Sequence, residues 1–110
     1  MDRSVNRLEL RGYVGRDPRV REIGDRKVIN LSIATNEHYL DKEGKQCEIT
    51  TWHRVEAWSG EKMPNFDNIK KGTLLALTGK IRNNKYVNAD NEEVKYNDVL
   101  AVRMEIEKPM

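Results

Sequence analysis

Cysteine, histidine and long apolar runs are scarce in this 110-residue chain, and each shortage narrows the functions open to it. Cys47 is the only cysteine, so an internal disulfide and a cysteine metal cluster are excluded. No window approaches the roughly 18 apolar residues of a membrane span, and the opening MDRSVNRLEL lacks the apolar core of a secretory signal. We therefore expect a cytoplasmic protein that does not enter a membrane.

The side chains that an enzyme needs are also missing. The two histidines, His38 and His53, lie 15 positions apart on different predicted elements, no glycine-rich phosphate loop occurs, and no pair of carboxylates stands near a nucleophile. We expect a binding protein without catalytic residues, cofactor or metal.

The net charge of +2 is far from the strongly basic balance that would by itself indicate nucleic-acid binding. The cations are nevertheless clustered: eight Lys or Arg lie between Arg3 and Lys27, and a second group comprises Lys80, Arg82 and Lys85. Such clusters are common on the solvated faces of soluble domains, so charge alone does not decide the function.

Short segments of alternating apolar and polar residues, separated by Gly, Asp and Asn, predict a mainly β protein that forms one domain over residues 1–110. We expect strands near residues 8–14, 29–35, 49–58, 73–82 and 94–106, with residues 36–48 forming a projecting hairpin loop. Apolar residues at three-residue spacing before Gly72 predict one helix within residues 59–72. This order favours a five-stranded OB-fold Greek-key barrel with one short helix between the third and fourth strands, because closure removes exposed sheet edges.

The segment ITTWHRVEAW, residues 49–58, is the most informative part of the chain. Strand alternation predicts one inward face, made of Ile49, Thr51, His53, Val55 and Ala57. The other face then holds Thr50, Trp52, Arg54, Glu56 and Trp58. Two tryptophans with an arginine between them are thus expected to meet solvent or a partner; packing beneath a loop or a subunit is the alternative.

Single-stranded DNA offers what such a face can bind. Bases stack on aromatic rings, with about 1–3 kcal/mol per base, and phosphates attract the neighbouring cations. Neither contact identifies the base, and a duplex hides its base faces in the stack. The pattern therefore predicts binding to single strands without sequence preference.

The segment TTWHRVEAW, read with SVNRLELRGYVGRDPRVR, LSIATNE and KKGTLLALTGKIR, resembles the bacterial single-stranded DNA-binding protein family. The match runs from about Ser4 to Ile106, and its most specific part is WHRV with the upstream turn Gly15-Arg-Asp17-Pro18. The resemblance implies an OB-fold subunit that assembles as a homotetramer and wraps single-stranded DNA in replication, recombination and repair, in the cytoplasm at the bacterial nucleoid.

The resemblance also implies residue roles. The family's stacking aromatics fall on Tyr39, Trp52, Trp58 and Tyr86. Its phosphate contacts fall on Arg7, Arg21, Lys42, Arg54, Lys71, Arg82 and Lys85. His53 matches a histidine near the subunit interface, whereas Tyr13, Phe66 and Tyr96 are interpreted as packing residues.

The end of the chain departs from the family pattern. Family members usually continue into a flexible linker and an acidic tip that recruits other replication proteins, whereas this sequence stops at Met110, so we do not expect tail-mediated recruitment. The choice between dimer and tetramer stays open. So do two other functions: a primosomal or mobile-element accessory barrel that binds DNA and proteins, and an oligosaccharide-binding barrel that would not need flanking cations.

Overall fold

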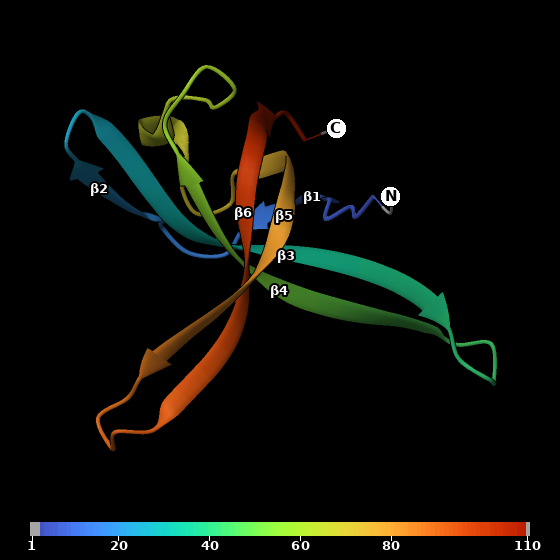
Figure 1. Cartoon of the computed structure of the whole chain (residues 1–110). Coiled ribbons are helices and arrows are strands. Elements are labelled where there is room, and N and C mark those ends of the chain that lie inside the picture. Colours follow the sequence, from blue (N-terminus) through green and yellow to red (C-terminus); the bar gives the residue numbers. More distant parts are fainter. Residues whose placement is uncertain (1–2, 110) are drawn as a thin grey trace.

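A computed structural model describes residues 3–109, which form six strands and one turn of 3-10 helix (Figure 1). In chain order these are β1 (Leu8–Val14), β2 (Arg19–Ile23), β3 (Arg26–Leu40), β4 (Gln46–Trp58), η1 (Phe66–Asn68), β5 (Leu74–Val87) and β6 (Glu93–Glu107). No helix among the described residues has the length and apolarity to cross a membrane.

The strands close into a barrel. The sheet order is β1-β5-β6-β4-β3-β2, and β1 also pairs with β3, so β1, β3, β4, β5 and β6 form a closed ring with β2 added outside β3. Closure depends on Gly12, where a Cβ would overlap the backbone oxygen of Ala34. Only the β4–β6 pairing is parallel among the described strands. These observations confirm the predicted mainly β, five-stranded barrel.

The core follows from strand alternation. Within β3, every second residue from Ile29 to Ile33 is buried, and these residues meet alternating residues of β4, β5 and β6 inside the ring. The buried members are Ile29, Leu31, Ile33, Val55, Ala57, Leu75, Leu77, Val99 and Ala101.

The helix predicted within residues 59–72 is a single 3-10 turn over Phe66–Asn68. Asn65 caps this turn through a hydrogen bond from the Asp67 N–H to the Asn65 side chain, 2.9 Å. Phe66 and Ile69 are buried in the barrel core. Their three-residue spacing therefore arises because the segment packs against the barrel, and not because it forms one face of a longer helix.

Two hairpin arms extend beyond the barrel, β3–β4 in green and β5–β6 in orange, and they diverge from each other (Figure 1). Tyr39 and Tyr86 therefore lie on strands and not in loops. Ile49, predicted to face inward, is half exposed, and Thr51 is exposed as well, because no barrel lies beneath this part of the β4 arm.

Candidate nucleic-acid interface

Trp52 presents its ring on the outer face of β4, as alternation predicts, and remains 60% exposed. Its six-membered ring lies against Gly15, where a Cβ would overlap it. The missing side chain of Gly15 thus leaves room for the indole to lie over the backbone. A large exposed ring held in one place by its neighbour is a platform on which a flat ligand can stack.

A cation and two tyrosines continue this surface onto the β5–β6 arm. The Arg54 guanidinium carbon lies 4.6 Å from the ring centroid of Tyr96, within cation–π range. The rings of Tyr96 and Tyr86 meet edge to face, with centroids 5.8 Å apart. Tyr96, predicted to be a packing residue, therefore connects Arg54 to the predicted stacking residue Tyr86.

Trp58 is half-buried, on the same face of β4 as Trp52 but farther along the strand. The Arg26 guanidinium carbon lies 5.2 Å from its ring centroid. The indole N–H of Trp58 donates to a carboxylate oxygen of Glu56 at 3.3 Å. The ring is consequently fixed by protein contacts and offers less free area than the ring of Trp52.

Arg82 lies in an ionic cluster on the β5–β6 ribbon, where it is directly opposite Asp98. Its guanidinium donates to both Asp98 oxygens at 3.0 and 2.7 Å and to Glu56 at 3.2 Å. Burial on its own raises the pKa of Asp98, but hydrogen bonds from Arg82 and Asn84 outweigh burial and hold that pKa below its ordinary value. Of the predicted phosphate ligands, Arg82 is thus the one most engaged within the protein.

Tyr39 points the other way. Its partner in the β3–β4 register is Cys47, which places Tyr39 on the ribbon face opposite to that of Trp52. Lys42 is exposed in the turn at the tip of this arm. These two predicted DNA-binding residues are therefore not brought together with Trp52 and Arg54.

A comparison with protein-family models gives a match to the single-strand binding protein family over residues 5–107. The chain belongs to this family. The match confirms the predicted family.

Curated members of the family include a single-stranded DNA-binding protein of Neisseria meningitidis, 34% identical over 104 residues, which cover 94% of this chain and 60% of the relative. A mitochondrial single-stranded DNA-binding protein of Danio rerio is 28% identical over 109 residues, 92% of this chain and 75% of the relative. This chain thus spans about 60% of the length of the Neisseria relative.

Solved structures share the fold. A Plasmodium falciparum single-strand binding protein in complex with single-stranded DNA matches with a TM-score of 0.83 at 23% identity, over 98% of this chain and 99% of that one. The wild-type single-stranded DNA binding protein of Thermus aquaticus matches with a TM-score of 0.78 at 19% identity, over 97% of this chain and 52% of that one.

Three other positions predicted by family resemblance are far from one another along the chain. Arg7 precedes β1 and pairs with Glu9 at 3.5 Å; Lys85 pairs with Glu93, also at 3.5 Å. Lys71 is exposed, and its backbone N–H donates to Asp17 at 2.9 Å. Phosphate binding by these three cations stays a prediction.

His53 is half-buried beneath the Trp52 face, where its Nε2 is 2.8 Å from the Thr35 hydroxyl. Burial lowers the pKa of His53, and the charge of Glu37 counteracts this only in part. A hollow beside His53 is also lined by Leu8 and Leu10 of β1. The predicted role of His53 at a subunit interface is untested.

Sequence reasoning missed two arginines that line a hollow together with Trp52. Arg16 and Arg19 line one hollow together with Arg21, Trp52 and Arg54. The only signal was spacing: Arg19 and Arg21 are two positions apart and share a face once residues 19–23 form a strand, which was not among the predicted strands. It could not be used before β2 was known to pair with β3.

Proposed function

We propose that residues 1–110 act as one unit that binds single-stranded DNA without reading its sequence. The exposed ring of Trp52 carries this proposal: it lies on the outer sheet face with Arg54 and lines a hollow with Arg21. A ring beside guanidinium groups suits a ligand that has flat bases and phosphates in alternation. The same ligand is supported by the family membership and by the similar Plasmodium falciparum structure, which is a complex with single-stranded DNA.

A bound strand would wrap around the molecule, because its predicted stacking sites face different directions. Trp52 and Trp58 lie on β4, Tyr39 lies on the opposite face of the β3–β4 arm, and Tyr86 lies on the divergent β5–β6 arm (Figure 1). Each stacked base contributes roughly 1–3 kcal/mol. We propose that the predicted phosphate ligands contact the backbone of a strand on such a path; they are Arg7, Arg21, Lys42, Arg54, Lys71, Arg82 and Lys85.

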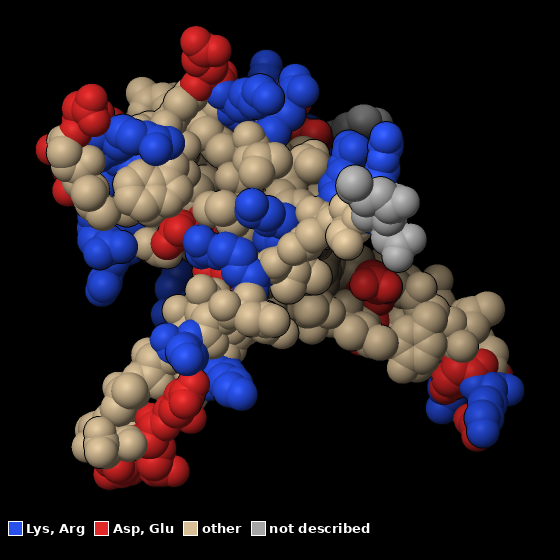
Figure 2. Space-filling model, in the orientation of Figure 1, with Lys and Arg blue, Asp and Glu red and all other residues tan. Residues whose placement is uncertain are grey.

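Acidic side chains limit this path. They gather at the far end of the β5–β6 hairpin, at the lower left of Figure 2, where Asp90, Glu92 and Glu93 are all exposed. These carboxylates would repel phosphate, so we place the end of the DNA path on this arm near Tyr86.

Titration with oligo-dT tests the proposed function. Binding is expected to quench tryptophan fluorescence and to weaken steeply as salt rises, because phosphate contacts release counterions. Trp52→Ala should weaken binding, while Trp52→Phe, which keeps a smaller ring, should retain part of it. Equal competition by a duplex of the same length would contradict the proposal.

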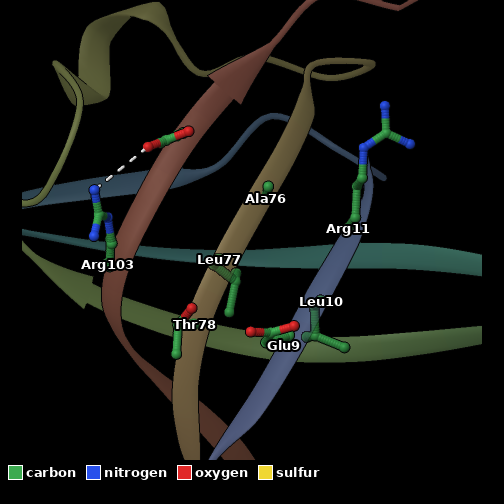
Figure 3. A pocket seen from close by; sticks show the side chains of 8 residues that line it. Glu9, Leu10, Arg11, Ala76, Leu77, Thr78 and Arg103 are labelled. Atoms are coloured by element: carbon green, nitrogen blue, oxygen red, sulfur yellow. Dashed lines mark ion pairs between the residues drawn. The ribbon is translucent and has the colours of Figure 1, made fainter.

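We further propose that the chain forms a homotetramer. The shallow hollow in Figure 3 crosses the outer face of β1, β5 and β6, where Glu9, Thr78 and Arg103 form one row and Arg11, Ala76 and Glu105 form the next. Suppose that a second copy packs face to face on this surface, related by a two-fold axis that runs parallel to β5 between the two copies. Glu9 of each copy then lies opposite Arg103 of the other, and Arg11 lies opposite Glu105. The face is therefore self-complementary in charge.

A second possible interface involves β1. Among the described strands, residues 8–11 pair only with β5, and β1 lies beside the hollow that His53 lines. An unpaired strand edge can accept the same strand of another copy. Two different two-fold interfaces generate a tetramer of dihedral symmetry.

Light scattering tests the assembly. Glu9→Arg should lower the mass from tetramer to dimer, and Glu9→Arg combined with Arg103→Glu should restore the tetramer. Failure of the charge swap to restore the tetramer would count against this face.

We also propose that the protein functions in replication, recombination and repair at the nucleoid in the bacterial cytoplasm. A fluorescent fusion should form foci that follow replicating DNA, and foci that do not follow it would argue against this role.

A further inference from the structure

The outer faces of β2, β3 and β4 form one continuous surface, because these strands pair in unbroken register. Arg19 is two strands away from Glu56, through Asn30. Likewise, Arg21 on β2 pairs with Val28 on β3, and Val28 pairs with Trp58 on β4. Directly paired residues project to the same side of an antiparallel sheet. Both arginines therefore share a face with the tryptophans.

This surface has two rims of different chemistry, and we call it the trough. Its floor, on β3, consists of Asn30, Ser32 and Ala34. Its cationic rim consists of Arg16, Arg19 and Arg21, and its aromatic rim consists of Trp52, Arg54, Glu56 and Trp58. Two strand spacings, about 10 Å, separate β2 from β4.

Small floor residues leave the trough open. A hollow of about 740 Å³ lies between the rims and is lined by residues of both rims and by Asn30 and Ser32 of the floor. Cavities of a few hundred cubic ångströms or more are large enough for an organic ligand. The trough is thus a cavity and not only a pattern on a flat sheet.

The cationic rim is free to bind an anion. Arg16, Arg19 and Arg21 are exposed, and within residues 3–109 none of them forms an ion pair. Asp17 is the one acid that lines the hollow, and its carboxylate accepts the Lys71 N–H at 2.9 Å. The excess of positive charge is therefore on the β2 side of the trough.

The acid on the aromatic rim is already compensated. Glu56 accepts hydrogen bonds from Arg82 at 3.2 Å and from the Trp58 indole at 3.3 Å. Its negative charge consequently does little to exclude a polyanion from the floor.

We propose that Arg16 and Arg19 are DNA-binding residues and that the trough orients the strand, with phosphates along β2 and bases turned toward β4. This inference rests on the proposed function and deepens it. Guanidinium groups bind phosphate with two donors in a fixed fork, and aromatic rings bind bases by stacking, so each rim suits one side of a nucleotide.

The test uses Arg16→Ala/Arg19→Ala, with Arg3→Ala/Lys108→Ala as the control. The control removes the same charge near the chain ends, on the other side of the barrel from β2 (Figure 1). Each phosphate contact contributes about 0.7 to the slope of log affinity against log salt. The rim variant should lose about 1.4 from this slope, so over a fourfold rise in salt wild-type affinity falls about sevenfold more than that of the variant.

Two further probes separate phosphate contacts from base contacts. An abasic oligonucleotide keeps phosphates without bases, and a neutral-backbone oligomer keeps bases without charge. Of these two probes, the rim variant should bind only the abasic oligonucleotide more weakly than wild type does. Trp52→Ala should bind only the neutral-backbone oligomer more weakly. A rim variant with the slope of the control would overturn the inference while leaving the proposed function intact. No binding of oligo-dT by the wild-type chain would overturn both.

Discussion

Gly15→Ala tests whether the position of the Trp52 ring, and not only its presence, determines DNA binding. An added Cβ would overlap the indole, with Cη2 at 2.7 Å and the Ser32 hydroxyl at 3.2 Å. Gly15 is not among the described residues with positive φ, so alanine introduces no backbone strain. Because the overlapped atoms belong to the outer end of an exposed ring, the ring should swing away and the fold should persist.

The expected loss is that of one stacked base. At roughly 1–3 kcal/mol per base, Gly15→Ala should weaken oligo-dT binding about 5- to 150-fold. Stability should be unchanged or higher by about 0.4–1 kcal/mol, since alanine restricts the unfolded chain. In a Trp58→Phe background Trp52 is the only tryptophan, so its fluorescence reports both the displaced ring and bound DNA.

A double-mutant cycle provides the control. If Gly15 acts through Trp52, then Gly15→Ala should have no further effect once Trp52 is alanine. An equal loss of affinity in the presence and absence of the indole would refute the reasoning, as would full affinity with a displaced ring.

Three other substitutions test contacts around this surface. Asp98→Asn should lower the free energy of unfolding by about 1–3 kcal/mol; in urea denaturation, wild type alone should lose this contribution as pH falls below about 4, through the lowered pKa of Asp98. Burial lowers the pKa of His53, so as pH falls the histidine is protonated in the unfolded chain before it is protonated in the folded one. The free energy of unfolding should therefore decrease as pH drops below 6.5, and His53→Gln should remove this pH dependence. Tyr96→Leu should weaken oligo-dT binding about 2- to 5-fold in a titration, because Arg54 loses the ring that holds its guanidinium and Tyr86 loses its edge-to-face neighbour.

Alternation along β4 predicted which residues are buried and which are exposed where the barrel lies beneath the strand. Val55 and Ala57 are buried and Trp52 is exposed, as expected. The prediction was wrong at Ile49 and Thr51 because alternation cannot show where a strand leaves the barrel. The predicted helix is only one 3-10 turn for a related reason: Phe66 and Ile69 are spaced for burial, which a loop can achieve with few helical hydrogen bonds.

Residue types indicated the site's chemistry, but contacts between distant segments decide which residues take part. Asp98 is the main partner of Arg82, 16 positions away in sequence. Cation–π contact between Arg54 and Tyr96 joins β4 to β6. Neither contact has a local sequence signal, because the register of two strands far apart in sequence creates both.

Pairing also explains how a chain with a net charge of only +2 can attract a polyanion. Arg7, Arg82 and Lys85 each lie within ion-pair distance of a carboxylate, so part of their positive charge is neutralised within the protein. Arg16, Arg19 and Arg21 have no such partner among residues 3–109 and stand along one rim. Because screening limits charge interactions to about 10 Å, a phosphate at the trough responds to these unpaired arginines and hardly to the acidic tip of the β5–β6 arm. On the proposed function, the local excess of unpaired cations, and not the sum over the chain, therefore sets the attraction for DNA.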